Sequence, residues 1–239
     1  MVHPHQVAVI LCIALFFMVP GSAVINDTPS SNLFHVSAYS LLADGQYDGV
    51  VTVGDLKNNG TFGIGGYEHM DGELLMLDGT VWQITHDGVV YEPSDDTKVC
   101  FANIIHFNPT ITHQVNETLD KAEVYTVITD LFPDDDTIYA VKVTGDFADM
   151  QARSVPSQSP PYPPLSEVIQ NQSVFDLGPV IGTLTGFWFP DWMAGVNVAG
   201  FHQHFISADN TSGGHALNYT IKNVTISIQP VTGFTYIHP

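Results

Sequence analysis

Apolar stretches rich in β-branched and aromatic residues, each bounded by turn residues, recur along most of the chain. This pattern predicts β-strands, because such side chains fit a pleated, half-buried surface. Asp78-Gly79 and Asp87-Gly88 each separate two apolar runs, which is a strong hairpin signal and predicts an antiparallel meander. The strands predicted in the first half are residues 49–56, 60–66, 73–93 and 98–107.

A second series of predicted strands occupies the C-terminal part of the chain. Residues 134–155 lie between the two series and are predicted to form a strand, a turn at Gly145-Asp146 and another strand. The strands predicted in the second series are residues 182–190, 200–207, 215–224 and 224–231.

Two stretches have helical periodicity instead. Residues 116–132 place four apolar side chains near a spacing of 3.6, and residues 31–45 show the same pattern over a shorter length. Residues 156–164 contain five prolines, which predicts an extended linker, and a short helix is expected to start within residues 165–170.

The predicted fold class is therefore α+β, with two β-rich lobes, a few short helices and a shared core. We expect an N-terminal lobe over residues 24–155, a proline-rich linker over 156–170 and a C-terminal metal-binding lobe over 171–239. A chain of 239 residues is long enough for such a core.

The first 23 residues are typical of a cleaved signal peptide. The apolar run VAVILCIALFFMV is too short for a comfortable membrane span, and small residues up to Ala23 follow it. A soluble, secreted protein is the expectation. Seven Asn-x-Ser/Thr sequons favour N-glycosylation, at Asn26, Asn59, Asn116, Asn171, Asn210, Asn218 and Asn223.

The formal net charge of −19 changes the range of partners that we expect. Nucleic acids and anionic membranes both require a basic surface, so neither is an expected partner. A small anionic substrate would need local positive charge, and Arg153 is the single arginine of the chain.

The candidate chemistry centres on the stretch GFHQHFISADNTSGGH. His202 and His204 are two positions apart on a predicted strand, so their side chains share one face. His215 opens the next predicted strand after a Gly-Gly turn and can meet the pair across a hairpin. Three imidazoles form a zinc site with one open position, although iron, manganese, copper or cobalt also fit. The alternative is three polar side chains on a solvated face.

Three further residues are candidates for the reaction itself. Arg153 precedes the proline-rich linker, between the predicted lobes, and could hold a carboxylate. Asp71 and Glu73 lie beside a predicted turn, and either could act as an acid or base. On spacing alone, Arg153 could equally be a surface arginine, and carboxylates beside a turn are more often solvated than functional.

Taken together, these stretches resemble the alpha-acetolactate decarboxylase family. The resemblance rests on YAVKVTGDF, ARSVPSQSPPYPPLSEV, GTLTGFWFPDWMAGVNVAGFHQHFIS and SGGHALNY, together with DGQYDGVVTVGDLKNNGTFGIGG and DGELLMLDGTVWQI. These pieces stand in the family's order and spacing from about residue 33 to residue 218.

The resemblance implies a two-lobed fold with mixed β-sheets, often a homodimer, and a zinc ion bound by His202, His204 and His215. It implies catalytic roles for Glu73 and Arg153. The implied reaction is decarboxylation of 2-acetolactate, a small anionic 2-hydroxy-3-keto acid, to acetoin and carbon dioxide.

One feature departs from the family. Bacterial members carry an acidic metal ligand in a longer C-terminal tail, whereas TGFTYIHP at the end of this chain has no carboxylate side chain. Water, His238 or the terminal carboxylate is then expected as the fourth ligand.

Two other functions remain open at this point: a cupin-like metal-dependent oxygenase, and a secreted metal-binding glycoprotein without catalysis.

Overall fold

The structure is a computed structural model that describes residues 31–239. The predicted signal peptide and the sequon at Asn26 lie outside the described residues. Among the helices of the described part, none has the length and apolar character needed to cross a bilayer.

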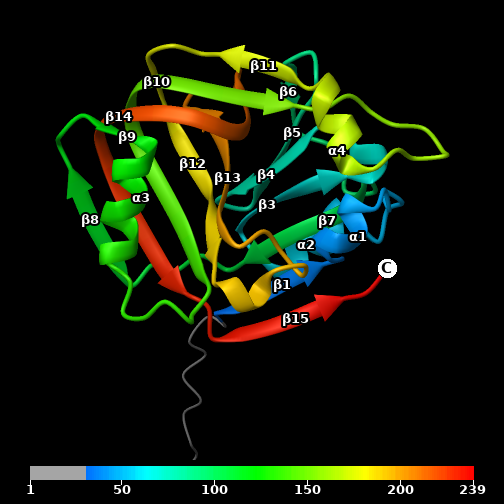
Figure 1. Cartoon of the computed structure of the whole chain (residues 1–239), viewed down its shortest axis with the longest axis horizontal. Coiled ribbons are helices and arrows are strands. Elements are labelled where there is room, and N and C mark those ends of the chain that lie inside the picture. The colour runs from blue at the N-terminus through cyan, green and yellow to red at the C-terminus, as the bar shows by residue number, and fades with distance from the viewer. Residues whose placement is uncertain (1–30) are drawn as a thin grey trace, which may run out of the picture.

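Most of the described chain forms two β-sheets that lie side by side (Figure 1). In the first sheet β15 pairs with β1 in parallel, and the other pairings of this sheet are antiparallel. Its strands, in spatial order, are β15 (Gly233–Ile237), β1 (Asn32–Val36), β7 (Lys98–Ile105), β3 (Phe62–Tyr67), β4 (Glu73–Leu77), β5 (Thr80–Ile84) and β6 (Val90–Tyr91), and β2 (Val51–Thr52) also pairs with β7.

The second sheet is antiparallel and partly closes on itself. β10 pairs with both β12 and β14, and β13 joins β12 to β14, so four strands form a ring of pairings. Its strands are β11 (Ser173–Asp176), β10 (Tyr139–Ser154), β12 (Val180–Phe189), β13 (Gly200–Ser207), β14 (Gly213–Pro230) and β8 (Ile111–Val115), and β9 (Leu119–Asp120) also pairs with β14.

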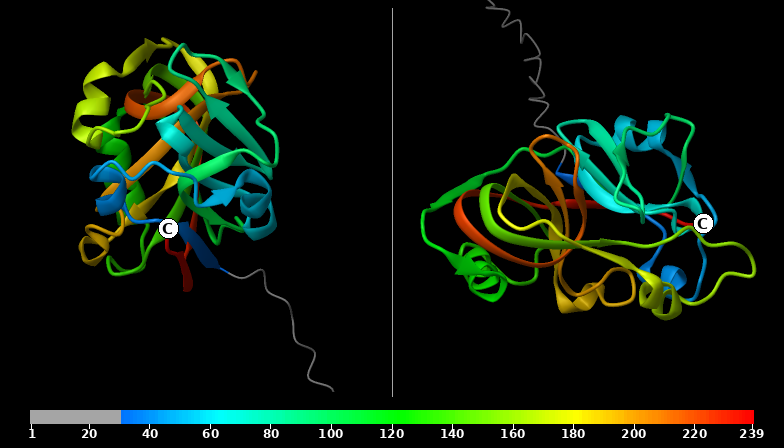
Figure 2. Two further views of the ribbon diagram at one scale, coloured as in Figure 1. Left: turned by 90° about the vertical axis from the view of Figure 1, so that its right-hand side faces the viewer. Right: turned by 90° about the horizontal axis from the view of Figure 1, so that it is seen from above.

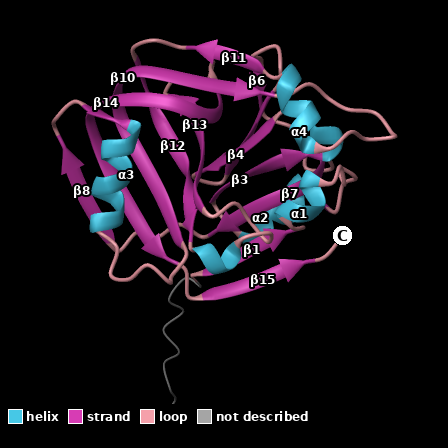
Figure 3. Cartoon of the chain, in the orientation of Figure 1, coloured by secondary structure: helices cyan, strands magenta, loops and turns pink. Residues whose placement is uncertain are grey.

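The helices are few and short (Figure 3). α3 lies against the second sheet and buries Val124 and Ile128 there. The α-helices are α1 (Tyr39–Ala43), α2 (Val53–Asn59), α3 (Lys121–Asp130) and α4 (Leu165–Val168); 3₁₀ turns occupy Glu68–Met70, Ile169–Asn171 and Asp191–Met193.

The two sheets share a core, as expected. Leu33 and Ile64 of the first sheet pack in one buried cluster with Ala140 and Phe187 of the second. The views in Figure 2 show the strands of the two sheets adjacent to one another. A hydrogen bond from Ser154 Oγ to the carbonyl of Ile84, 2.8 Å long and buried, also ties them together.

The predicted meander is confirmed over β4, β5 and β6. Asp78 and Gly79, between β4 and β5, both have positive φ, of 50° and 85°. Positive φ at both central residues gives the turn that matches the twist of a hairpin, which explains the Asp-Gly pair.

The strand predicted at residues 49–56 is wrong for most of its length, because α2 begins at Val53. The Thr52 side chain accepts a hydrogen bond from the Asp55 amide, and the Asp55 side chain accepts one from the Thr52 amide. This capping box supplies a helix start that outweighs the β-branched composition.

The helix predicted at residues 31–45 is also wrong in its first part. Residues 32–36 form β1, between β7 and β15, and only Tyr39–Ala43 is helical. A strand buried on both faces has a continuous apolar run, which periodicity alone does not separate from a buried helix. The helix predicted at residues 116–132 is confirmed as α3, although it begins only at Lys121.

The turn predicted at Gly145-Asp146 does not occur, since β10 runs through it as one strand of 16 residues. A Cβ at Gly145 would lie 2.2 Å from the carbonyl oxygen of Asn223 on β14. The glycine therefore serves the close approach of two strands, and not a reversal of the chain. The strands predicted at 215–224 and 224–231 are likewise one strand, β14.

Sheet membership does not follow the expected division at the linker. β8, β9 and β10 precede the linker but belong to the second sheet, and β15 returns from the C-terminal end to the first. Long-range pairing of this kind leaves no local signal in the sequence.

Candidate active site

Three histidines converge where β13 meets β14. His202 and His204 alternate on β13 and share one face, and His204 pairs directly with His215 on β14. The ring centroids are 5.3 Å, 5.2 Å and 5.3 Å apart in the three pairs. One potential ligand atom from each ring lies within 4.8 Å of the other two. The hairpin predicted from the sequence is thus confirmed, and it brings the three imidazoles together.

The same row of residues extends to Arg153. His215 pairs with Arg153 on β10 as well as with His204 on β13, so three neighbouring strands place these side chains on one face. Gly214, next to His215, permits this packing: its φ is 138°, and a Cβ there would lie 2.4 Å from the Arg153 carbonyl oxygen.

Glu73 reaches the histidines from the other sheet, as the first residue of β4. Its Oε1 accepts a hydrogen bond of 2.7 Å from Arg153 Nη1, and its Oε2 lies 3.4 Å from His204 Nε2. Glu73 is only 4% exposed. Burial raises the pKa of Glu73 above its usual value, and the Arg153 charge partly opposes that rise.

One hydrogen bond of the His204 ring determines which of its two nitrogens is free to bind a metal. Its Nδ1 lies 2.8 Å from the carbonyl oxygen of Leu74, which can only accept, so Nδ1 donates. In the neutral ring Nε2 then carries a free lone pair. A carbonyl that orients a histidine through its second nitrogen is the usual support of a metal ligand.

These residues fit a bound metal ion. His204 Nε2 and His202 Nδ1 are buried and have no hydrogen-bond partner in the described structure. Buried polar atoms are normally paired, so two such atoms in one cluster indicate a missing partner. Three nitrogen ligands and one open coordination position are typical of a catalytic zinc site. Other transition metals accept the same three ligands.

Burial lowers the pKa of all three histidines, to about 4 for His202. The positive charge of Arg153 acts in the same direction on each. The folded chain therefore favours the neutral imidazoles that a metal requires.

A pH dependence of stability follows for the metal-free protein. A histidine whose pKa is depressed by folding stabilises the fold above about pH 6.5, and this contribution is lost as pH falls towards its folded pKa. We expect the melting temperature of chelator-treated protein to fall between pH 7 and pH 5. Each histidine contributes at most about 1.4 kcal/mol per pH unit. His202→Gln should flatten the profile, and an unchanged profile would contradict this assignment.

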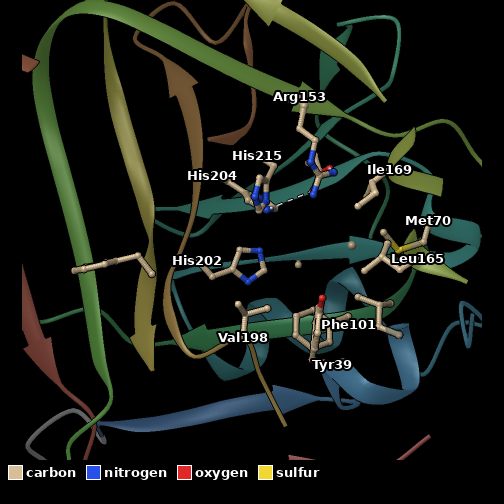
Figure 4. A pocket seen from close by; sticks show the side chains of 15 residues that line it. Tyr39, Met70, Phe101, Arg153, Leu165, Ile169, Val198, His202, His204 and His215 are labelled. Carbon is tan, nitrogen blue, oxygen red and sulfur yellow. Dashed lines mark hydrogen bonds and ion pairs between the residues drawn. The ribbon is translucent and has the colours of Figure 1, made fainter. Parts of the chain in front are cut away.

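The cluster lies at one side of a cavity of ≈ 250 Å³ (Figure 4). The three histidines, Arg153 and Glu73 line the polar side. The rest of the lining is mainly apolar: Tyr39, Leu42, Met70, Phe101, Leu165, Ile169, Val198 and Phe201, with Gly65 and Gly66. An apolar pocket with a few converging polar groups is the usual form of a small-molecule site.

The sequence did not point to most of this apolar lining. Leu165 and Ile169 come from the short helical segment that follows the prolines, and Met70 from the 3₁₀ turn before β4. Isolated apolar residues carry no mark of the cavity that they line, since core and pocket positions look alike in sequence.

The other histidines of residues 31–239 do not line this cavity. His238 is exposed, and its Nδ1 lies 2.7 Å from the Pro239 carbonyl oxygen. It lines a separate groove with Ser37, Asp48 and Tyr162, so it does not contribute to this cavity. Its expected alternative role as a metal ligand is therefore not supported by its position.

Comparison with known proteins places this geometry in a family. The sequence profile of alpha-acetolactate decarboxylase matches residues 33–239. An alpha-acetolactate decarboxylase from Methanosarcina mazei is 40% identical over 198 residues, which cover 83% of this chain and 69% of that protein. One from Brevibacillus brevis is 38% identical over 209 residues, which cover 87% of this chain and 73% of that protein.

The fold agrees with solved structures of the same family. The alpha-acetolactate decarboxylase of Bacillus subtilis strain 168 superposes with a TM-score of 0.85 at 30% identity, covering 87% of this chain and 89% of that one. The extent of both matches shows that the chain belongs to the alpha-acetolactate decarboxylase family.

Proposed function

We propose that the chain decarboxylates 2-acetolactate to acetoin and carbon dioxide, with a zinc ion held by His202, His204 and His215. Membership of the family supports the reaction. The observation that carries the proposal is the meeting of three histidines with the Arg153–Glu73 pair in one cavity. These five side chains come from four strands of two sheets, so their convergence is a property of the whole fold.

The substrate has a carboxylate, a hydroxyl and a ketone on adjacent carbons. When bound, the zinc ion supplies a Lewis acid that can interact with these oxygens. Loss of carbon dioxide breaks a carbon–carbon bond, and the electron pair passes towards the ketone oxygen as an enediolate. Protonation of the carbon that carried the carboxylate then gives acetoin.

Arg153 has the role of holding the anionic substrate. Its side chain is 13% exposed, which places its charge in a weakly solvated position where attraction to an anion is strong. Since the chain carries a formal net charge of −19, this local positive charge offsets the repulsion of an acidic surface.

Glu73 has the role of moving the proton. Among the residues that line the cavity, Glu73 is the one with a carboxylate. Because its pKa is raised, it can carry a proton nearer to neutral pH than a solvated glutamate can. The Arg153 hydrogen bond orients one carboxyl oxygen and leaves the other directed towards His204.

Export and N-glycosylation are part of the proposal. They are supported by the sequence of residues 1–23 and by the exposure of five sequon asparagines, Asn116, Asn171, Asn210, Asn218 and Asn223. A loss of mass on enzymatic deglycosylation of the protein recovered from culture medium tests this point, and no change would count against it. A homodimer is proposed from family analogy alone.

The test of function is to incubate the purified protein with racemic 2-acetolactate and measure acetoin and carbon dioxide. We expect both products in equal amounts without oxygen uptake. Oxygen consumption would instead support a metal-dependent oxygenase, and bound metal without turnover would support a binding role.

A further inference from the structure

Gly66 lines the cavity, and it lies between two other lining residues in the first sheet. On β3 it pairs with Glu73 of β4 on one side and with Phe101 of β7 on the other. Directly paired residues of antiparallel strands point to the same face of a sheet. A side chain at position 66 would therefore point towards the cavity, as those of Glu73 and Phe101 do.

Packing does not require a glycine at this position. A Cβ on Gly66 would lie 3.5 Å from Met70 Sδ, 3.9 Å from Met70 Cε and 4.0 Å from Cys100 Sγ, which are ordinary contacts. The backbone of Gly66 does not have positive φ. Its neighbour differs: a Cβ on Gly65 would lie 2.2 Å from the Phe101 carbonyl oxygen, so only glycine fits there.

The position of that missing Cβ is on the apolar side of the cavity. Its nearest neighbour would be the thioether of Met70, which Figure 4 shows together with Leu165 and Ile169 on the side away from the histidines. In the proposed function, the oxygens of the substrate face the side of the cavity that carries the histidines and Arg153. Its alkyl groups then face the apolar side, where their burial is favourable.

We propose that Gly66 sets the upper size of the alkyl substituent on the substrate, because it leaves open the space that any side chain at this position would fill. This inference rests on the proposed function for its substrate class, the 2-alkyl-2-hydroxy-3-keto acids. A single methylene in an apolar pocket changes discrimination by about 10- to 200-fold, so even alanine at position 66 should be sufficient to detect the effect.

The experiment compares the wild type with Gly66→Ala and Gly66→Ser on 2-acetolactate and its 2-ethyl and 2-propyl homologues. We expect the ratio of kcat/KM for the 2-propyl homologue to that for 2-acetolactate to fall at least about tenfold in both variants. Gly54→Ala is the matched control: Gly54 lies on α2, near Asp95, and does not line the cavity, so its ratio should equal that of the wild type.

A binding measurement separates this inference from the proposed function. The dissociation constants of zinc-loaded protein for 2-hydroxy-2-methylbutanoate and its longer 2-alkyl analogues do not depend on turnover, because these acids have no ketone. A selective loss of affinity for the longer analogues in Gly66→Ala supports the role of Gly66, whether or not acetoin forms. Equal affinities across the series in wild type and variant would overturn it, whereas absence of acetoin from the wild type would overturn only the proposed reaction.

Discussion

Glu73→Gln is expected to lower kcat/KM for 2-acetolactate by about 10²–10⁴-fold, the usual contribution of a positioned acid or base. Glutamine keeps the size of the side chain and can still accept the hydrogen bond from Arg153 Nη1, which is 2.7 Å long in the native pair. Glutamine cannot deliver a proton to the carbon that has lost carbon dioxide. The variant also leaves the Arg153 charge without its buried counterion, and this costs stability.

Asp71→Asn is the matched control for Glu73→Gln. Asp71 lies two residues earlier, accepts a hydrogen bond of 3.3 Å from Gln83, and lines a different groove. We expect its activity to stay near that of the wild type. Metal content and melting temperature must be measured for both variants. Full activity in a folded, metal-loaded Glu73→Gln protein would show that the proton takes another route.

His202→Ala is expected to remove both metal retention and activity. Loss of groups that merely support a ligand already weakens metal affinity by about 10–100-fold, so removal of one of three direct ligands should exceed this range. His202 suits the test because it is less buried than His204 and its Nδ1 has no hydrogen bond to lose. The substitution therefore removes a ligand with little damage to the fold.

The readouts for His202→Ala are zinc content after dialysis, by mass spectrometry, and acetoin formation. His113→Ala is the control, since His113 is exposed on β8 and far in sequence from the cluster. We expect the control to retain about one zinc per chain. If His202→Ala also kept one tightly bound zinc ion, the three-histidine site would be wrong.

The histidine cluster was the part of the site most accessible from the sequence. A period of two put His202 and His204 on one face, and the Gly-Gly turn before His215 indicated a hairpin. Both signals depend only on residues that are close in the sequence, so they can be interpreted without knowing how the two sheets pack. The role expected for Glu73 came from the family resemblance, because its approach to His204 depends on how the two sheets pack.

Arg153 illustrates why longer-range features escaped the sequence. Its place beside His215 requires β10 to continue through Gly145 and pair with β14 along its whole length. The Gly-Asp pair at 145–146 has the composition of a turn, yet close strand packing accounts for the glycine. The same limit applies to Gly66, since nothing in GIGG distinguishes a glycine required by packing from one that leaves a cavity open.

Zinc-dependent decarboxylation is tested most directly by reconstitution of chelator-treated protein with measured amounts of zinc, followed by measurement of acetoin formed from 2-acetolactate. We expect no activity without metal and a linear recovery of activity that ends at about one zinc per chain, as one three-histidine site requires. Acetoin formation that is unaffected by removal of the metal, or a folded protein with one bound zinc that forms no acetoin, would contradict zinc-dependent decarboxylation by this chain.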